Sequence, residues 1–367
     1  MEHILEEFYE LVQIPSPTLG EREMADALKE KLTELGFSVT DDDAGKKTGG
    51  NAGNIFARLP ASKGCHADPI LLSAHMDRVP GGDEIEPLLD GDLIVTDGST
   101  ILAADDVAGI CAILDGVRGV LSEELPHPEI EILFTISEEV KLRGSRNFDF
   151  SKVHAKEAYC MDSSGRLGRI VTGAPSIEEL VFRVHGKRAH AGNEPEKGID
   201  ALRGAANILC DIREGRLDGE TTANWSVISA GNVTNVVCDL AEVHGEVRSH
   251  DDGKVTEYEE YCKRHIASKT DGTGLVTEWE VRPNHGSFRV ADDSRCVKRL
   301  KAAFAGCGFR CETEIGGGGM DANIINEHGI ECVGVAVGYA KNHTTEEMQY
   351  VKDLVKAGQL VKALLSL

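Results

Sequence analysis

The sequence predicts an α/β protein in which a βαββαβ segment of the ferredoxin-like type is inserted into a larger α/β domain. Up to residue 175 the chain alternates amphipathic helices with short apolar strands, and this alternation resumes near residue 287. The length of 367 residues exceeds the ~100–200 residues typical of one domain. We therefore assign residues 1–175 and 287–367 to one domain and residues 176–286 to an inserted domain.

The first part of the chain begins with two predicted helices. Residues 4–14 and 21–36 carry apolar side chains at helical spacing, and Gly36 is expected to end the second helix, because glycine adopts the left-handed conformation common after helix C-termini. Apolar runs then predict strands at residues 54–59, 69–75, 130–137 and 158–163. The last three strands lead into residues that can bind metal. In α/β sheets, ligands bind beyond the carboxyl ends of the strands, so this placement indicates a site.

The inserted domain is predicted from a change in element order. A strand, a helix, two strands, a helix and a strand are expected at residues 177–186, 198–215, 224–231, 239–249, 254–268 and 274–283. Helix and strand patterns of the first kind then return at residues 297–308, 320–329, 331–338 and 353–365.

Composition excludes several classes of partner. With 62 acidic and 39 basic residues, the formal charge of −23 would repel nucleic acids and anionic membranes. We expect neither as a partner. The ten cysteines are scattered, with no two pairs spaced for a thiolate zinc site, and reduced thiols are expected. No apolar run approaches the ~20 residues of a membrane span, and the N-terminus does not resemble a signal peptide, so a cytoplasmic location is expected.

Two motifs could bind metal, but each also has an explanation that involves no metal. His75 and Asp77 alternate after an apolar strand, and Asp77 could hold the second ring nitrogen of His75, although a chance pair is the alternative. Asp105 and Asp106 open an apolar helix over residues 107–117, where carboxylates commonly act as caps. A carboxylate can also bridge two cations through its two oxygens.

Three further candidates follow predicted strands. Glu138 and Glu139 come after residues 130–137, and such a pair can divide its roles between metal binding and proton transfer. Asp162 and His343 follow two other strands. Each residue alone would more often be a polar loop residue. Their conjunction indicates a two-metal site with a carboxylate left over as a base, and hence hydrolysis by water.

The chain resembles the dizinc exopeptidases and deacylases, a family that includes peptidase T, carboxypeptidase G2-type enzymes and acetylornithine deacetylase. The similarity covers nearly the whole chain and is greatest to the peptidase T-like branch. Its motifs occur in matching order: SAHMD, LAADDVAG, the glutamate pair, MDSSG, TGAPS, GKRAHAG, TNVV, EVRSHD, GGGGMDANIIN and NHTTEE. This resemblance implies a mixed-sheet zinc exopeptidase domain with an inserted lid and dimerisation domain.

The resemblance also implies roles for individual residues. His75 and Asp162 would bind one divalent ion, Glu139 and His343 the other, and Asp105 would bridge them through a turn with a cis peptide bond to Asp106. Zinc is the expected metal, with cobalt and manganese as alternatives. The catalytic residues would be Glu138, as general base, and Asp77, which would orient a metal-binding histidine.

In the inserted domain, the resemblance implies that His190, Asn235 and Arg248 contact substrate, and that two copies of the chain pair through this domain. Arg248 suits a substrate carboxylate, because a guanidinium can bind one through two hydrogen bonds. The reaction implied by the peptidase T likeness is removal of the N-terminal residue from a short peptide, with a tripeptide as the leading substrate. A carboxypeptidase or N-acyl amino acid deacylase is an alternative, and so is a metal-binding scaffold without activity.

Overall fold

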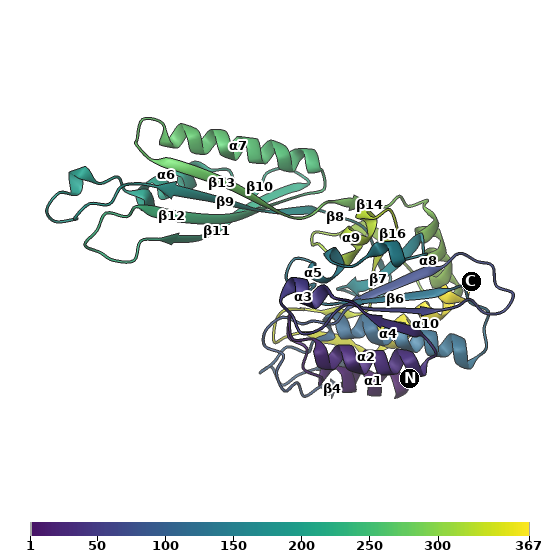
Figure 1. Cartoon of the computed structure of the whole chain (residues 1–367). Coiled ribbons are helices and arrows are strands. Elements are labelled where there is room, and N and C mark those ends of the chain that lie inside the picture. The colour runs from purple at the N-terminus through teal and green to yellow at the C-terminus, as the bar shows by residue number, and fades with distance from the viewer. Residues whose placement is uncertain (1, 367) are drawn as a thin grey trace. The chain divides into compact units, whose positions relative to one another are not determined.

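The computed structural model describes residues 2–366, which form two compact units. The first unit contains the chain up to Ala174 and from Phe288 onward, and the second contains Pro175–Ser287 (Figure 1). The units thus divide at 174/175 and 287/288, whereas the sequence predicts divisions at 175/176 and 286/287. The predicted fold class, a mixed-sheet α/β domain with a ferredoxin-like insertion, is confirmed.

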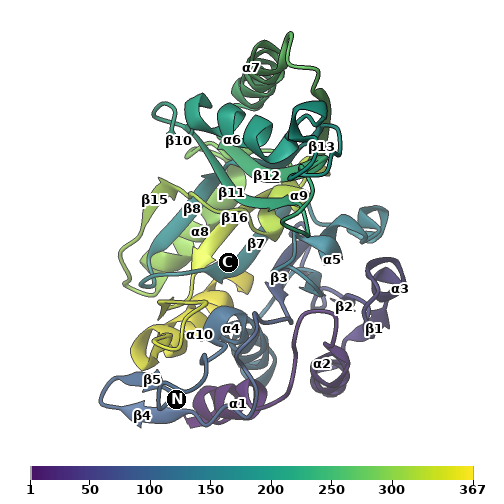
Figure 2. The ribbon, with the colours of Figure 1, turned by 90° about the vertical axis from the view of Figure 1, so that its left-hand side faces the viewer.

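The first unit is built on a nine-stranded sheet with the order β1-β2-β6-β3-β7-β16-β8-β14, in which β15 pairs with β8. Its four central strands, β6, β3, β7 and β16, run parallel, whereas β2 pairs antiparallel with β6. The carboxyl ends of the four parallel strands therefore lie at one edge of the sheet. Figure 2 labels β2, β3, β7 and β16 of this sheet. The strands are β1 (Ser38–Asp41), β2 (Ile55–Leu59), β3 (Ile70–His75), β6 (Ile130–Thr135), β7 (Glu157–Ser163), β8 (Arg169–Ala174), β14 (Phe288–Arg289), β15 (Glu312–Ile315) and β16 (Glu331–Ala336).

Amphipathic helices pack on this sheet. Met24, Ala25, Leu28 and Leu32 form the buried stripe of α2, and Gly36 follows that helix with a positive φ of 88°, as predicted. The long helix α4 packs on β3 and β7 and against α10. The helices of this unit are α1 (Glu2–Val12), α2 (Arg22–Glu34), α3 (Ala44–Thr48), α4 (Ala104–Ser122), α5 (Arg143–Arg146), α8 (Arg295–Gly306), α9 (Asp321–Glu327) and α10 (Val351–Leu365).

A small four-stranded sheet in the same unit was not predicted. It has the order β17-β18-β5-β4 and joins strands of two or three residues from opposite ends of the chain. Segments this short carry too few residues to show an alternating pattern. The strands are β4 (Leu88–Asp90), β5 (Leu93–Val95), β17 (Tyr339–Ala340) and β18 (Met348–Tyr350).

The second unit is an antiparallel sheet with the order β10-β11-β12-β9-β13 and two helices that pack on it. Apart from the two-residue β10, the elements follow the predicted βαββαβ order. Asp200 caps α6 by accepting a hydrogen bond from the backbone of Arg203. The elements are β9 (Ser176–His185), α6 (Ala201–Asp211), β10 (Gly215–Arg216), β11 (Thr221–Ala230), β12 (Leu240–Ser249), α7 (Asp252–Thr270) and β13 (Val276–His285). Among residues 2–366, no helix has the length and apolar character needed to span a bilayer.

Candidate metal centre

The predicted metal-binding residues lie together at the carboxyl edge of the parallel strands. His75 is the last residue of β3, Glu138 and Glu139 follow β6, and Asp162 lies near the end of β7. Asp105 comes from the start of α4 and His343 from the segment after β17. The side chain of His343 is 48% exposed, whereas His75 and Asp105 are 2% and 8% exposed, so the cluster opens to solvent on the His343 side.

Asp105 lies between the two histidines. Its Oδ1 is 3.1 Å from Nε2 of His75, and its Oδ2 is 3.3 Å from Nε2 of His343. Asn342 also donates a hydrogen bond of 2.7 Å to Oδ2. Each carboxylate oxygen thus faces a different histidine, which is the arrangement that a bridging ligand requires.

The surrounding donors form three overlapping groups, one of which consists of Asp105, Asp106 and Asp162. Donor atoms of His75, Glu138 and Asp162 all lie within 4.8 Å of one another, and so do those of His75, Asp105 and Glu139. Glu139 Oε1 is also 3.0 Å from Nε2 of His343. Imidazole nitrogens and carboxylate oxygens are donors that zinc accepts in catalytic sites. The donor set therefore fits two divalent cations.

The electrostatics of the cluster also favour cations. Burial, aided by the charge of Asp162, raises the pKa of Glu138 well above its usual range. Burial also raises the pKa of Asp162 to about 7, although His75 opposes the shift. Burial lowers the pKa of His75, but the hydrogen bond to Asp105 and the nearby carboxylates outweigh it, so the pKa lies well above its ordinary value. Crowded carboxylates of this kind are stabilised in their charged form when a cation binds between them.

Hydrogen bonds accepted by Asp77 organise the cluster somewhat differently from the prediction. Nδ1 of His75 lies 2.9 Å from the backbone carbonyl oxygen of Asp77 and 3.5 Å from its carboxylate, so the carbonyl is its nearer partner. The Asp77 carboxylate instead accepts hydrogen bonds from the backbone N–H groups of Glu138 (2.8 Å) and Glu139 (3.3 Å). Asp77 therefore fixes the glutamate turn and, through its backbone, the ring of His75.

The turn that carries Asp105 is held by a residue without a predicted role. The Asp105–Asp106 peptide bond is cis, and Ala103 has a positive φ of 57°. The buried carboxylate of Glu347 accepts hydrogen bonds from the backbone N–H groups of Leu102, Ala103 and Asp105 at 2.8–3.0 Å. The capping role considered for the aspartate pair falls to Asp106, whose carboxylate accepts from the backbone of Gly109.

Sequence reasoning also missed Tyr339 and Asn342. The hydroxyl of Tyr339 donates a hydrogen bond of 2.9 Å to Oδ1 of Asp162. Both Asn342 and Glu347 stand within four positions of His343 in the motif KNHTTEE, and this proximity is the sequence signal that could have suggested them. Tyr339 also stands four positions from His343, but it lies outside that motif and its partner is 177 positions away.

We expect Tyr339→Phe to weaken binding of a divalent metal ion at the cluster by about tenfold or more, since partners of metal ligands typically contribute that much to affinity. The measurement is titration of metal-free protein with zinc in competition with a chromophoric chelator. Tyr159→Phe is the matched control, because Tyr159 is also buried, lies on the same strand as Asp162, and donates to the carbonyl of Cys296. Equal zinc affinity in the two variants would contradict the role of Tyr339.

The cluster lines a cavity of about 250 Å³ within the first unit. The glycine run Gly316–Gly319 forms part of its wall. At Gly317 and Gly318 an added Cβ would meet no protein atom within 4 Å, so both face open space. The remaining lining residues are His75, Asp105, Glu138, Glu139, Asp162, Ser163, Ser164, Arg169, Val171, Met320, Tyr339, Asn342 and His343.

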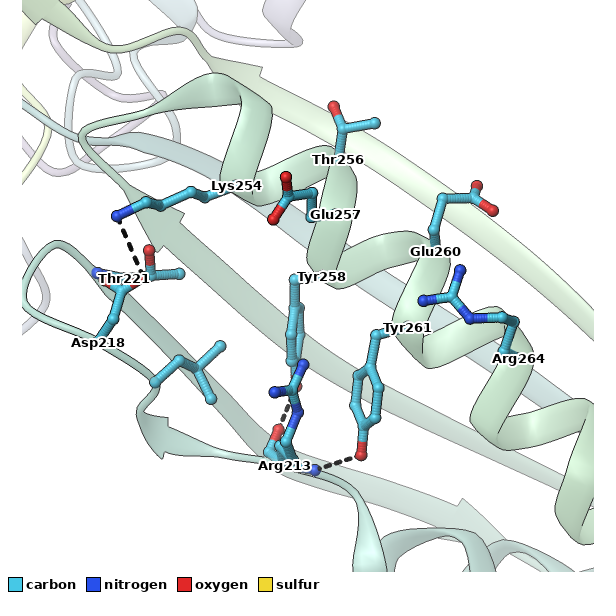
Figure 3. A pocket seen from close by; sticks show the side chains of 11 residues that line it. Arg213, Asp218, Thr221, Lys254, Thr256, Glu257, Tyr258, Glu260, Tyr261 and Arg264 are labelled. Atoms are coloured by element: carbon cyan, nitrogen blue, oxygen red, sulfur yellow. Dashed lines mark hydrogen bonds and ion pairs between the residues drawn. The ribbon is translucent and has the colours of Figure 1, made fainter.

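A larger cavity of about 530 Å³ lies in the second unit, beside α7 (Figure 3). Among its charged side chains, Lys254 pairs with Asp218, and the guanidinium of Arg213 lies 4.1 Å from the ring centroid of Tyr261. Its lining contains both basic and acidic side chains, so it does not favour a ligand of either charge. None of the described clusters of potential metal ligands lies there.

The first unit contains a further cluster of possible metal ligands, formed by Glu129, Glu131 and His154. Arg58 already binds Glu131 through Nε and Nη2 at 3.1 and 2.9 Å, and the backbone of His154 and Ala155 donates to the same carboxylate. The Arg58 guanidinium thus occupies the position beside Glu131 that a metal ion would need.

The three predicted substrate-binding residues lie in the second unit. His190 is exposed, and its Nδ1 accepts hydrogen bonds from the backbone of Gly192 and Asn193 at 3.1 and 3.2 Å. Asn235 is exposed on the neighbouring segment, where its backbone carbonyl accepts a hydrogen bond from the backbone N–H of Ala191. Arg248 is half-buried on β12, and its Nε donates to Glu246 at 2.8 Å.

Comparison with family models finds two matches. A model of the peptidase dimerisation domain matches residues 173–273. A model of peptidase family M28 matches residues 54–169. The first covers most of the inserted unit, and the second covers the strands that carry His75, Glu138, Glu139 and Asp162.

Known proteins match over almost the entire chain. The crystal structure of aminopeptidase PepT from Bacillus cereus has a TM-score of 0.91 and 38% sequence identity, covering 100% of this chain and 98% of that one. A tripeptidase from Staphylococcus aureus has a TM-score of 0.94 and 31% identity, covering 100% and 97% of the two chains. Peptidase T from Escherichia coli is 25% identical over 95% of this chain and 91% of its own length.

Proposed function

The chain belongs to the peptidase T-like family of metallopeptidases, and we propose that it removes the N-terminal residue from short peptides, principally tripeptides, with two divalent metal ions bound. One observation carries the proposal. The carboxylate of Glu138 lies among these donors, within 4.8 Å of donor atoms of His75 and Asp162, and it forms no side-chain hydrogen bond with any of residues 2–366. A purely structural metal site has no use for such an additional, uncommitted carboxylate.

The metal ligands in this proposal are His75 and Asp162 for one ion, Glu139 and His343 for the other, and Asp105 for both. The distances from Asp105 to the two histidines, 3.1 and 3.3 Å, support its bridging position. When bound, two such ions lower the pKa of a water molecule to ~7 and polarise the scissile carbonyl. Zinc is the proposed metal, with cobalt and manganese as alternatives.

Glu138 is the proposed general base. It would accept a proton from the attacking water and then transfer it to the leaving amine, as a positioned carboxylate does in general acid–base catalysis. The hydrogen bond from its backbone to Asp77, at 2.8 Å, keeps the glutamate turn in place during both transfers. The neighbouring glutamate, Glu139, faces His343 and is left to bind metal.

His190 is proposed to stabilise the oxyanion formed on the substrate. Because Nδ1 of His190 accepts two backbone hydrogen bonds, the proton of the neutral ring resides on Nε2. Nε2 can then donate to a developing negative charge. Asn235 would bind the substrate beside it, and Arg248 would bind a substrate carboxylate. In this proposal the inserted domain supplies these substrate contacts, and two copies of the chain pair through that domain.

The test is hydrolysis by zinc-loaded protein of a free tripeptide, its N-acetylated form and a set of N-acetyl amino acids, with products separated by chromatography. We expect release of the N-terminal residue from the free tripeptide alone, loss of activity after chelation, and recovery when zinc, cobalt or manganese is added. Cleavage at the C-terminus, or of N-acetyl amino acids, would instead identify a carboxypeptidase or deacylase. Metal binding without hydrolysis of any of these would identify a scaffold.

A further inference from the structure

We propose that Arg169 is a specificity-determining residue that binds a carboxylate of the substrate within the first unit, an inference that rests on the proposed peptidase function. Arg169 is the first residue of β8 and lines the same cavity as the metal-binding cluster. Among the lining residues in the described part of the chain, it is the one arginine or lysine. A substrate in this cavity therefore meets carboxylates and histidines at the metal end and a guanidinium on another part of the wall.

The turn between β7 and β8 brings Arg169 back toward Asp162. Gly165 and Gly168 have positive φ angles of 102° and 117°, which allow the chain to reverse over six residues. Nη1 of Arg169 then donates to the carbonyl of Ser164 at 2.6 Å, only two positions after Asp162. The guanidinium is thus anchored to the segment that carries a predicted metal ligand.

Further contacts hold the guanidinium but leave one nitrogen available. Nε donates to the carboxylate of Glu314, and Nη1 also approaches Oγ of Ser163 at 3.5 Å. Nη2 makes no hydrogen bond with any residue between positions 2 and 366, and the side chain is 29% exposed. A guanidinium carries five N–H donors, so the two on Nη2 remain for water or a ligand.

The counter-ion of Arg169 does not share the cavity. Glu314 lines a neighbouring cavity, together with Arg289 and Asp292, and is absent from the wall around the metal-binding cluster. The wall therefore presents the positive side of this ion pair to the substrate. Because the guanidinium is already held by protein contacts, little conformational freedom is lost when it binds a carboxylate.

The chemistry that fits Nη2 is a carboxylate held by a charge-assisted hydrogen bond. In a short peptide this group is either the C-terminal carboxylate or the side chain of an aspartate or glutamate. Hydrogen bonds to charged groups typically change affinity by about tenfold or more. The alternative is that Arg169 only braces the turn at Ser163–Ser164, in which case its loss would affect all peptides equally.

The test uses zinc-loaded, full-length protein and three tripeptides whose first amide is reduced to a methylene-amine, so that they bind without being cleaved. The first has a free C-terminus, the second is its C-terminal amide, and the third is an amide with aspartate at its third position. Calorimetry of Arg169→Met should show about tenfold weaker binding than wild type for one carboxylate-bearing peptide and an unchanged Kd for the neutral amide. The peptide affected identifies the source of the carboxylate.

Arg289→Met is the matched control, since Arg289 is an exposed arginine on the adjacent strand β14 and does not line the metal-site cavity. It should bind all three peptides as wild type does. Glu314→Gln provides a second variant that retains the arginine, and it should tighten binding of the same carboxylate-bearing peptide without affecting the neutral one. This variant keeps the inference testable if Arg169→Met loses zinc.

A uniform loss on all three peptides, or no loss, in Arg169→Met would overturn the inference, as would a Glu314→Gln variant with no change in carboxylate selectivity. These outcomes are separate from failure of the proposed function, because calorimetry requires no turnover. If wild type selects carboxylates through Arg169 yet cleaves no parent tripeptide, the proposed function fails alone.

Discussion

Glu138→Gln should lower kcat for tripeptide hydrolysis by about 100-fold or more while both metal ions remain bound. The amide has nearly the size and shape of the carboxylate but cannot accept the proton of the attacking water. The effect should fall on kcat, because the carboxylate of Glu138 forms no side-chain hydrogen bond in the described chain that the substitution could break. Steady-state kinetics and metal analysis of the purified variant provide the measurement.

Glu139→Gln is the matched control for this prediction. Glu139 is the adjacent residue on the same turn, but its Oε1 lies 3.0 Å from Nε2 of His343. Its substitution should therefore lower the affinity for one metal ion, and activity should return when excess metal is supplied. If Glu138→Gln loses metal and Glu139→Gln keeps it but loses turnover, the two roles are reversed.

Asp105→Ala should abolish activity and reduce metal content from about two ions per chain to less than one. The carboxylate that is removed faces both histidines, at 3.1 and 3.3 Å, so its loss affects both proposed ion positions. The remaining carboxylates would then repel one another with fewer cations between them. Elemental analysis after equilibration with zinc and gel filtration provides the measurement.

Asp115→Ala, on the same helix α4 but outside the cluster, is the control and should retain two ions. Circular dichroism of both variants checks that the helix still forms. An Asp105→Ala protein that keeps two tightly bound ions would rule out the bridging role, and the donors would then have to form two independent sites.

Much of the fold was predictable because its strongest signals are local. Apolar periodicity identified the long helices and the central strands, and the change of element order near Ser176 identified the βαββαβ insertion. The short strands of the β17-β18-β5-β4 sheet were missed, because two or three residues show no period. Strand β8 was also missed, and with it the position of Arg169.

The candidate site was likewise predictable only in part. The chemical types of its donors, and their positions after strands, could be predicted from the sequence, although their roles stay predictions. The nearer partner of His75 was expected to be the carboxylate of Asp77, whereas the backbone carbonyl lies closer. Choosing between two oxygens of one residue requires the path of the chain after β3, which the sequence pattern does not specify.

The sequence by itself determined the order of the elements and which imidazoles and carboxylates end the strands, because hydrophobic periodicity and residue chemistry are properties of short segments. Only the tertiary structure decided which atoms face one another. It set Asp105 between two histidines, joined Glu347 to Leu102 across 245 positions, and turned Arg169 into the cavity beside Asp162. Such contacts depend on the packing of distant segments, in which most buried polar groups find a partner, and no local pattern encodes that choice.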